Sequence, residues 1–139
     1  MGYFHEFDPV NHISRVRFEG ELTDALVRKC YEDAKRLAAL KLRGAILDLS
    51  AVTSVQVESA TMHELASRPP LFNDPMPRFI VAPSDVTFGL ARMFQLQGDK
   101  TRQALQVVRT SAEAYSRLGI TAEHFMPMEL SGTNPPKMA

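Results

Sequence analysis

The chain has 139 residues, of which 45 % are hydrophobic and 23 % charged, a composition typical of soluble globular proteins that excludes a disordered chain. Its 16 Lys and Arg residues balance 16 Asp and Glu residues, so no net charge attracts nucleic acid or an anionic membrane. No apolar run reaches the roughly 18 residues of a membrane span, and Cys30 has no partner for an intrachain disulfide. We therefore expect a cytoplasmic protein without a membrane span.

The N-terminal part of the chain predicts a β-hairpin followed by a helix. Residues 13–18 (ISRVRF) alternate between two faces, as a half-exposed strand does, and residues 3–7 (YFHEF) supply a hairpin partner. After Gly20 the apolar residues recur every three or four positions. This change of period predicts an amphipathic helix capped by Thr23 or Asp24.

The rest of the chain alternates strands and helices. Buried strands are predicted at residues 45–49, 78–82 and 105–108, and helices at residues 57–68, 84–97 and 110–118. Thr110 and Glu113 have the spacing of a capping box, and Gly119 is a natural helix stop. The order β-β-α-β-α-β-α-β-α predicts an α/β fold with a mixed, mostly parallel sheet of about five strands. We expect one domain over residues 1–125 and a flexible tail over residues 126–139.

Two segments, FEGELT at residues 18–23 and ILDLSAVTSV at residues 46–55, resemble the STAS domain, the family of bacterial anti-sigma-factor antagonists. They are similar to it in a G-E-L turn into the first helix, a buried strand that ends in D-L-S, and a hydroxyl-bearing helix start soon after. Residues 78–95 and 110–119 resemble the SpoIIAA-like branch of uncharacterised bacterial proteins. The likeness covers about residues 13–119 and implies a STAS-like fold and a regulatory module that binds another protein.

The resemblance also bears on phosphorylation. In regulated STAS proteins the segment after D-L-S resembles D-S-S-G-L, whose second serine is phosphorylated by a partner kinase. The matching stretch here is Glu58, Ser59, Ala60, Thr61 and Met62, so an alanine occupies the usual acceptor position. Ser59 and Thr61 are the hydroxyls on either side of it.

Several polar side chains map to the carboxyl ends of the predicted strands. Ligands of open α/β sheets bind at that edge, where helix N-termini also favour anions. We expect a binding rim there, made of Asp48, Ser50, Glu58, Ser59, Thr61 and Ser84. The alternative interpretation is structural, with Ser84 as a helix cap and with Asp48 and Ser50 ordering a loop.

A second candidate surface lies in residues 68–79, where four prolines accompany several apolar residues. These apolar side chains either form an interface or a lid over a pocket, or fold back onto the domain. The expected interface or lid residues are Leu71, Phe72, Met76 and, on the following helix, Arg92. On that helix, Gly89 costs about 1 kcal/mol relative to alanine, which is tolerable where a backbone or ligand packs closely.

The sequence contains no recognisable catalytic or metal-binding pattern. The four histidines are scattered, no Gly-x-Ser-x-Gly or Walker motif occurs, and Cys30 faces the core of a predicted helix. We therefore expect no enzymatic activity, no metal and no cofactor. The leading interpretation is a regulatory protein-binding module, with a homodimer as one form of partnership. The alternative is a protein that binds a small apolar ligand or lipid in a pocket between helices and sheet, lined by Phe72, Met76, Met93 and Phe94.

Overall fold

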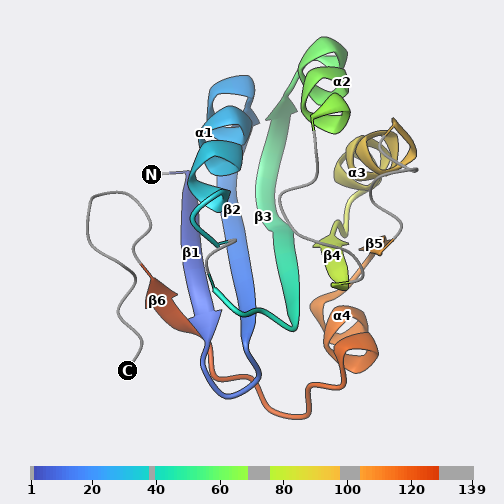
Figure 1. Ribbon diagram of the computed structural model, residues 1–139. Helices are drawn as coiled ribbons and strands as arrows, with labels where there is room; N and C mark the ends of the chain where they lie inside the picture. The colour runs from blue at the N-terminus through green and yellow to red at the C-terminus, as the bar shows by residue number, and fades with distance from the viewer. Residues whose placement is uncertain (1, 38–39, 69–75, 98–103, 129–139) are drawn as a thin grey trace.

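The computed structural model describes residues 2–37, 40–68, 76–97 and 104–128 (Figure 1). Within these ranges one sheet has the strand order β5-β4-β3-β2-β1-β6. Its strands are β1 (Tyr3–Asp8), β2 (Ile13–Thr23), β3 (Gly44–Gln56), β4 (Arg78–Val81), β5 (Leu105–Val108) and β6 (Met126–Met128). The helices are α1 (Asp24–Ala34), α2 (Ser59–Ser67), α3 (Asp85–Gln97) and α4 (Ser111–Leu118).

The sheet is mixed, which confirms the expected α/β class. Strands β2, β3, β4 and β5 run parallel to one another, because a helix connects each to the next. Strand β1 pairs antiparallel with β2 as the expected hairpin, and β6 pairs antiparallel with the other edge of β1. Helices α1, α2 and α3 cover one face of the sheet, and α4 covers part of the other.

The alternation of side chains along β2 explains why the sheet has two cores. Val16 and Phe18 point toward α1 and α3, where they join the larger apolar cluster. Ile13, which is fully buried, points to the opposite face and packs with Ile46 and the α4 residue Ala114. The period-two pattern in the sequence therefore correctly assigns these residues to opposite faces.

The predicted helix ends are confirmed where a side chain caps the helix. The Thr23 hydroxyl accepts a hydrogen bond from the backbone N–H of Leu26 at 3.2 Å at the start of α1. The Thr110 hydroxyl accepts one from Glu113 at 3.1 Å at the start of α4. Gly119 ends α4 with φ of 75°, in the left-handed region that glycine adopts without strain.

Strands β2 and β3 are both longer than their sequence patterns predict. Gly20 does not begin a turn into the first helix. It lies within β2 at φ of 74°, beside register shifts in the pairing with β3. After this irregularity β2 continues to Thr23, and β3 continues past the D-L-S segment to Gln56. The expected end of the third strand near residue 49 is therefore wrong by seven residues, from 49 to 56.

The expected boundary between domain and tail also differs from the structure. Residues 126–128 form β6, in which Met128 lies opposite His5 and its side chain joins Phe7 and Leu37 in a small apolar cluster. The segment therefore belongs to the sheet, and the sheet has six strands in the described ranges rather than about five. Residues 129–139 of the expected tail lie outside the described residues.

Candidate ligand-binding cavity

A cavity of about 220 Å³, partly open to the surface, lies between the sheet and the three helices that cover its first face. The sheet supplies its floor through side chains such as Val16, Phe18, Leu47, Leu49 and Ile80. The helices supply its walls through Val27, Cys30 and Tyr31 of α1, Met62 and Leu65 of α2, and Leu90, Ala91 and Phe94 of α3. These residues come together because the apolar face of each helix packs against the same face of the sheet.

The walls of the cavity are almost entirely apolar. Among the described lining residues, only Ser14, Tyr31 and Arg78 carry a hydroxyl or a charge. Cys30 contributes a thiol whose pKa is raised to about 12, first by burial and then by the nearby Asp33 carboxylate. The thiol is therefore protonated at neutral pH and behaves as a small apolar group, as expected for a core-facing cysteine.

The expected cavity-lining residues are only partly confirmed. Phe94 lines the cavity, whereas Met76 and Met93 are not among its described lining residues. Met76 is half-buried, and Leu71 and Phe72 lie outside the described residues. Arg92 is exposed on α3, where its guanidinium donates a hydrogen bond to Gln95 of the same helix. The lining residues on α1 and α2 were not predicted, because their periodic pattern does not distinguish a cavity wall from a filled core.

The binding rim expected from the sequence does not form one site. Asp48 and Ser50 lie in the middle of β3, where Asp48 accepts hydrogen bonds from the backbone N–H and hydroxyl of Ser50 at 2.9 and 2.5 Å. Gln56, the last residue of β3, lies six positions beyond Ser50, a distance of roughly 20 Å at about 3.3 Å per residue. The hydroxyls at the start of α2 are therefore remote from the D-L-S segment. The structural interpretation of Asp48 and Ser50 accounts for both side chains.

The expected rim residues at the start of α2 differ in exposure. Glu58 precedes the helix, and its backbone N–H donates to the Asp24 carboxylate at 2.9 Å. Ser59 is exposed, whereas Thr61 is only 3 % exposed and its hydroxyl accepts a hydrogen bond from Arg28 at 3.4 Å. The Ser59 side chain is therefore accessible to solvent, whereas that of Thr61 is not.

Ser84 acts as a cap at the start of α3. Its hydroxyl accepts a hydrogen bond from the backbone N–H of Thr87 at 3.1 Å and lies 2.7 Å from the Thr87 hydroxyl. Arg109 holds the same corner from the end of β5, donating to Pro83 O at 3.1 Å and to the Asp85 carboxylate at 3.0 Å. These contacts support the structural interpretation of Ser84.

A buried polar group that sequence patterns do not reveal lies between β1 and α1. The His5 ring stacks edge-on against Tyr3 and lies 4.0 Å from the Asp33 carboxylate. Within the described part of the chain, neither ring nitrogen has a hydrogen-bond partner. Burial lowers the pKa of His5 despite the nearby carboxylate, so the ring is neutral at neutral pH.

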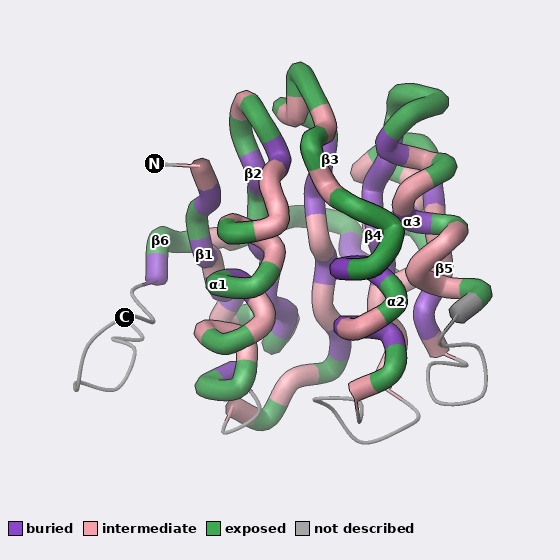
Figure 2. The backbone as a smooth tube through the Cα atoms, turned by 90° about the horizontal axis from the view of Figure 1, so that it is seen from above, coloured by how far each residue is buried: buried purple, intermediate pink, exposed green. Residues whose placement is uncertain are grey.

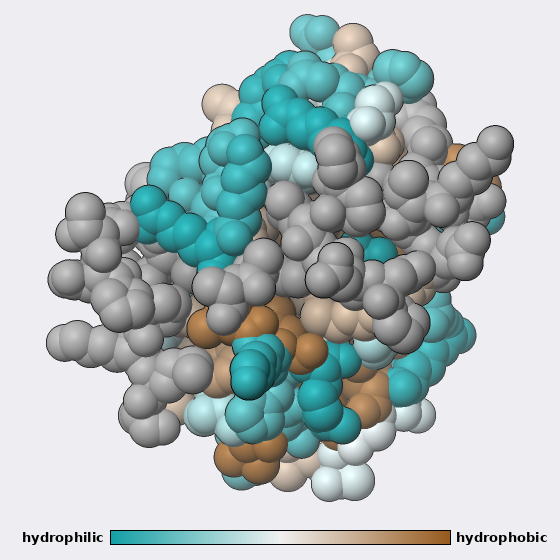
Figure 3. Space-filling view, viewed as in Figure 1, coloured by the Kyte–Doolittle hydropathy of each residue, from teal (hydrophilic) through white to brown (hydrophobic). Residues whose placement is uncertain are grey.

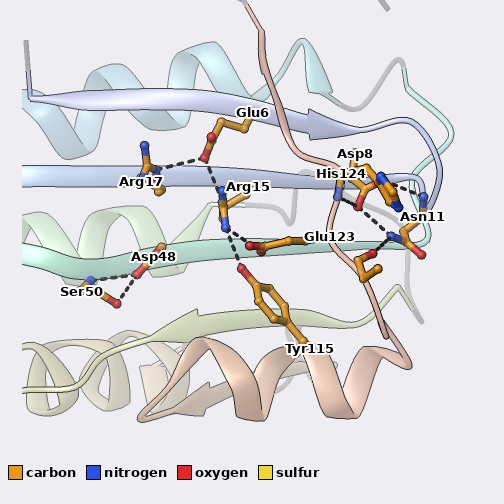
Figure 4. Close-up of polar contacts among 11 residues, drawn as sticks. Glu6, Asp8, Asn11, Arg15, Arg17, Asp48, Ser50, Tyr115, Glu123 and His124 are labelled. Carbon is orange, nitrogen blue, oxygen red and sulfur yellow. Dashed lines mark hydrogen bonds and ion pairs between the residues drawn. The ribbon is translucent and has the colours of Figure 1, made fainter. Parts of the chain in front are cut away.

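A polar network occupies the opposite face of the sheet (Figure 4). Arg15 donates hydrogen bonds to Glu6 at 2.9 Å and to the Tyr115 hydroxyl at 2.6 Å, and its guanidinium lies 4.0 Å from the centre of the Phe125 ring. Burial, together with Glu123, raises the pKa of Tyr115 to about 12. The hydrogen-bonding and charged groups of this network contact one another. We therefore interpret the network as structural, linking the hairpin, α4 and the segment before β6.

No protein-family model matches the chain, and no curated protein matches its sequence. In the described residues, no helix is both long enough and apolar enough to cross a membrane. No cluster of three or more metal-ligating side chains occurs in the same ranges.

Proposed function

We propose that the protein is a non-enzymatic module that binds a small apolar molecule in the cavity between the sheet and α1, α2 and α3. The cavity itself carries the proposal, because its volume of about 220 Å³ lies in the range of a ligand site. Engineered apolar cavities of about 150 Å³ take up benzene, and pockets for drug-sized ligands start at roughly 300 Å³. A molecule with one or two rings, or a short acyl chain, matches this volume.

The chemistry of the walls supports an uncharged ligand. A charged or strongly polar group loses its water on entering such a site and finds few partners there, which makes its transfer unfavourable. The protonated Cys30 thiol adds no charge. The proposal adopts the alternative that the sequence left open, a pocket between helices and sheet, although with a different set of lining residues.

The proposal is tested with a probe and a variant that fills the cavity. Ala91 is 3 % exposed and lines the cavity, so Ala91→Leu places three more carbon atoms in the space. We expect the fluorescence emission of the uncharged two-ring probe 1-naphthylamine to shift to the blue on binding to the wild-type protein, and its affinity to fall about ten-fold or more in Ala91→Leu. Ala112→Leu, at an exposed position of α4, is the matched control. Equal affinities in all three proteins, or no binding, contradict the proposal.

Native mass spectrometry of protein purified gently from its own host provides an independent test. A bound ligand adds a defined mass that disappears under denaturing conditions. If repeated preparations contain only the chain without a ligand, and the probe also fails to bind, the proposed ligand-binding function is wrong.

A second candidate is a STAS-like regulatory module that binds another protein in the cytoplasm. The observation that favours it is the upper edge of β3, residues 50–56. Strand β4 pairs with β3 only from Ala45 to Asp48, and within the described residues no strand pairs with β3 beyond that point on this side. The segment contains no charge and no proline, and Thr53 and Ser54 are exposed. Such an edge accepts an added strand, from a second copy of the chain or from another protein.

Two measurements test the second candidate. Sedimentation over a range of concentrations checks for a homodimer, and a monomer at every concentration contradicts self-association. The intact mass of the protein from its host checks for a phosphate on Ser59, the exposed hydroxyl beside Ala60. An unmodified chain under all growth conditions argues against a phosphorylation switch.

A further inference from the structure

Helices α1 and α2 lie on the same side of the sheet (Figure 2) and are joined by charged side chains. The Glu64 carboxylate of α2 accepts hydrogen bonds from Arg28 of α1 at 2.6 Å and from Arg68 at 2.7 Å. Arg68 also reaches back to Glu32 of α1 at 3.3 Å. The hydrogen bond from Arg28 is the main cause of the lowered pKa of Glu64, so this carboxylate is ionised at neutral pH.

The spacing of these residues follows from helix geometry. Asp24, Arg28 and Glu32 are four residues apart on α1, and Glu64 and Arg68 are four apart at the end of α2. Positions four apart share a helix face, so each helix presents a row of charges to the other. Together with the bond from Glu58 to Asp24, they form a ladder of polar contacts that we call the polar seam.

The polar seam lies directly over the wall of the cavity. Tyr31 of α1 and Leu65 of α2 line the cavity, and the Arg68 guanidinium lies 5.0 Å from the centre of the Tyr31 ring. On the solvent side the seam is exposed, with 44 % of the Arg28 side chain and 42 % of the Glu64 side chain accessible. Hydrophilic side chains accordingly gather over α1 and α2 in Figure 3.

Among the described residues, two other parts of the cavity boundary are held by apolar contacts. Helix α2 packs directly against α3, whereas the backbones of α1 and α2 approach each other less closely. Beyond the C-terminal end of α1, Leu37 packs with Phe7 and Met128 in an apolar cluster. Separating those contacts exposes apolar surface to water, but separating the polar seam exposes groups that water solvates well.

We propose that the polar seam between α1 and α2 is the portal through which the ligand enters and leaves the cavity, and that its ion pairs set the rate of exchange. The proposal rests on the cavity being the ligand site. Opening the seam moves α1 and α2 apart above Tyr31 and Leu65, and closing it restores the bonds to Glu64. The ligand contacts none of the seam's ion pairs in the closed state, so its affinity does not depend on them.

The test compares exchange rates with affinity for the same probe. Glu64→Gln keeps the size of the side chain and removes the charge that holds both Arg28 and Arg68. In stopped-flow fluorescence we expect the association and dissociation rates of 1-naphthylamine to rise together by about three- to ten-fold, with an unchanged equilibrium constant. Raising the salt concentration accelerates exchange in the wild type and has little effect in the variant.

The matched control is Glu113→Gln on α4. This substitution removes an ion pair of the same length, 2.7 Å to Arg117, with similar exposure but on the other face of the sheet. We expect wild-type exchange rates from it. A rate increase in this control equal to that of Glu64→Gln overturns the portal, because it indicates a general effect of charge.

A cross-link tests the same idea in the opposite direction. Cysteines placed by Arg28→Cys and Glu64→Cys are joined by a short bis-maleimide in a Cys30→Ala background, because Cys30 lines the cavity and the reagent could enter it. If the ligand passes through the seam, the cross-link slows probe exchange by about ten-fold or more relative to the same variant before cross-linking. The probe could also bind with unchanged exchange rates in both the cross-linked protein and Glu64→Gln. That result overturns the portal and leaves the cavity as the ligand site. Absence of probe binding to the wild-type protein overturns both.

Discussion

At the scale of single residues, Gly89 differs most clearly from its sequence interpretation. A glycine inside α3 was expected to allow a close approach of backbone or ligand. The residue is instead exposed, and a Cβ atom built on it meets nothing within 4 Å. The expected reason for this glycine is therefore wrong, and nothing in the structure explains it.

This position gives a direct prediction about stability. Gly89→Ala adds a methyl group in open space and restricts the unfolded chain, so the free energy of unfolding should rise by about 0.5–1 kcal/mol. Urea denaturation at neutral pH measures the change. Gly119→Ala serves as the contrast, since φ of 75° at that residue makes alanine strained and the substitution destabilising. Equal effects at the two glycines would refute the argument.

Asp8 is the second residue whose role is clear. It is fully buried and accepts hydrogen bonds from the backbone of Val10 at 2.9 Å and of His124 at 3.0 Å, and from both nitrogens of Asn11. Burial by itself would raise the pKa of Asp8, but these hydrogen bonds lower it below the ordinary value. The carboxylate therefore ties the hairpin turn to the segment that leads to β6.

We expect Asp8→Asn to lower the free energy of unfolding by about 2–3 kcal/mol at pH 7, because the donors around it lose a charged acceptor. The folded-state pKa lies below the unfolded one, so this stabilisation is complete above roughly pH 4 and is lost as the pH falls through the folded pKa. Denaturation curves from pH 7 to pH 2 should therefore converge for the wild type and the variant at the acid end. A gap that stays constant with pH would rule out a role for the ionised carboxylate.

At the scale of elements, the upper edge of β3 supports a prediction about association. If residues 50–56 pair with a second copy, a charge at the centre of the segment opposes pairing, because both copies then place like charges close together. Thr53→Lys should lower the apparent dimerisation constant at least about ten-fold in sedimentation experiments. Thr121→Lys, at an exposed position beyond α4, should leave it unchanged.

Elements with a strong periodic pattern were predictable from the sequence. The apolar runs of β4 and β5 and the capped start of α1 were correctly located, because their signals are local. The second half of β3 was not, since a segment rich in hydroxyl groups resembles a loop. It becomes a strand only by pairing with the end of β2, some thirty residues earlier in sequence. Strand β6 is three residues long and contains Pro127, so its sequence carries no strand signal.

The candidate site was predictable only in outline. Sequence patterns place apolar stripes on α1 and α3, but they do not give the distance between the helices and the sheet, which decides whether the space is filled. The residues of the expected rim lie apart for a related reason. Its residues were grouped on the assumption that β3 ends at D-L-S, and the longer strand moves Ser59 away from Asp48. The polar seam was not foreseen because it depends on how two helices are aligned.

At the scale of the whole molecule, ligand binding and folding are coupled. A molecule that binds only the folded state raises the free energy of unfolding by about 2.7 kcal/mol when its free concentration is 100 times its dissociation constant. We expect 1-naphthylamine to raise the melting temperature of the wild type and of Ala112→Leu but not that of Ala91→Leu. An equal shift in all three proteins would indicate binding outside the cavity.

The pairing of β6 with β1 also has a consequence for how the chain can be connected. Met128 lies opposite His5 in antiparallel register, so the last described strand ends beside the first one, near where the first begins. A linker of a few residues would therefore join residue 128 to residue 2 without changing the order of strands in the sheet. The fold would then admit circular permutation, with new ends opened at an exposed loop position such as Lys41. A permuted chain that folds would show that the sheet does not depend on the order in which its strands are synthesised.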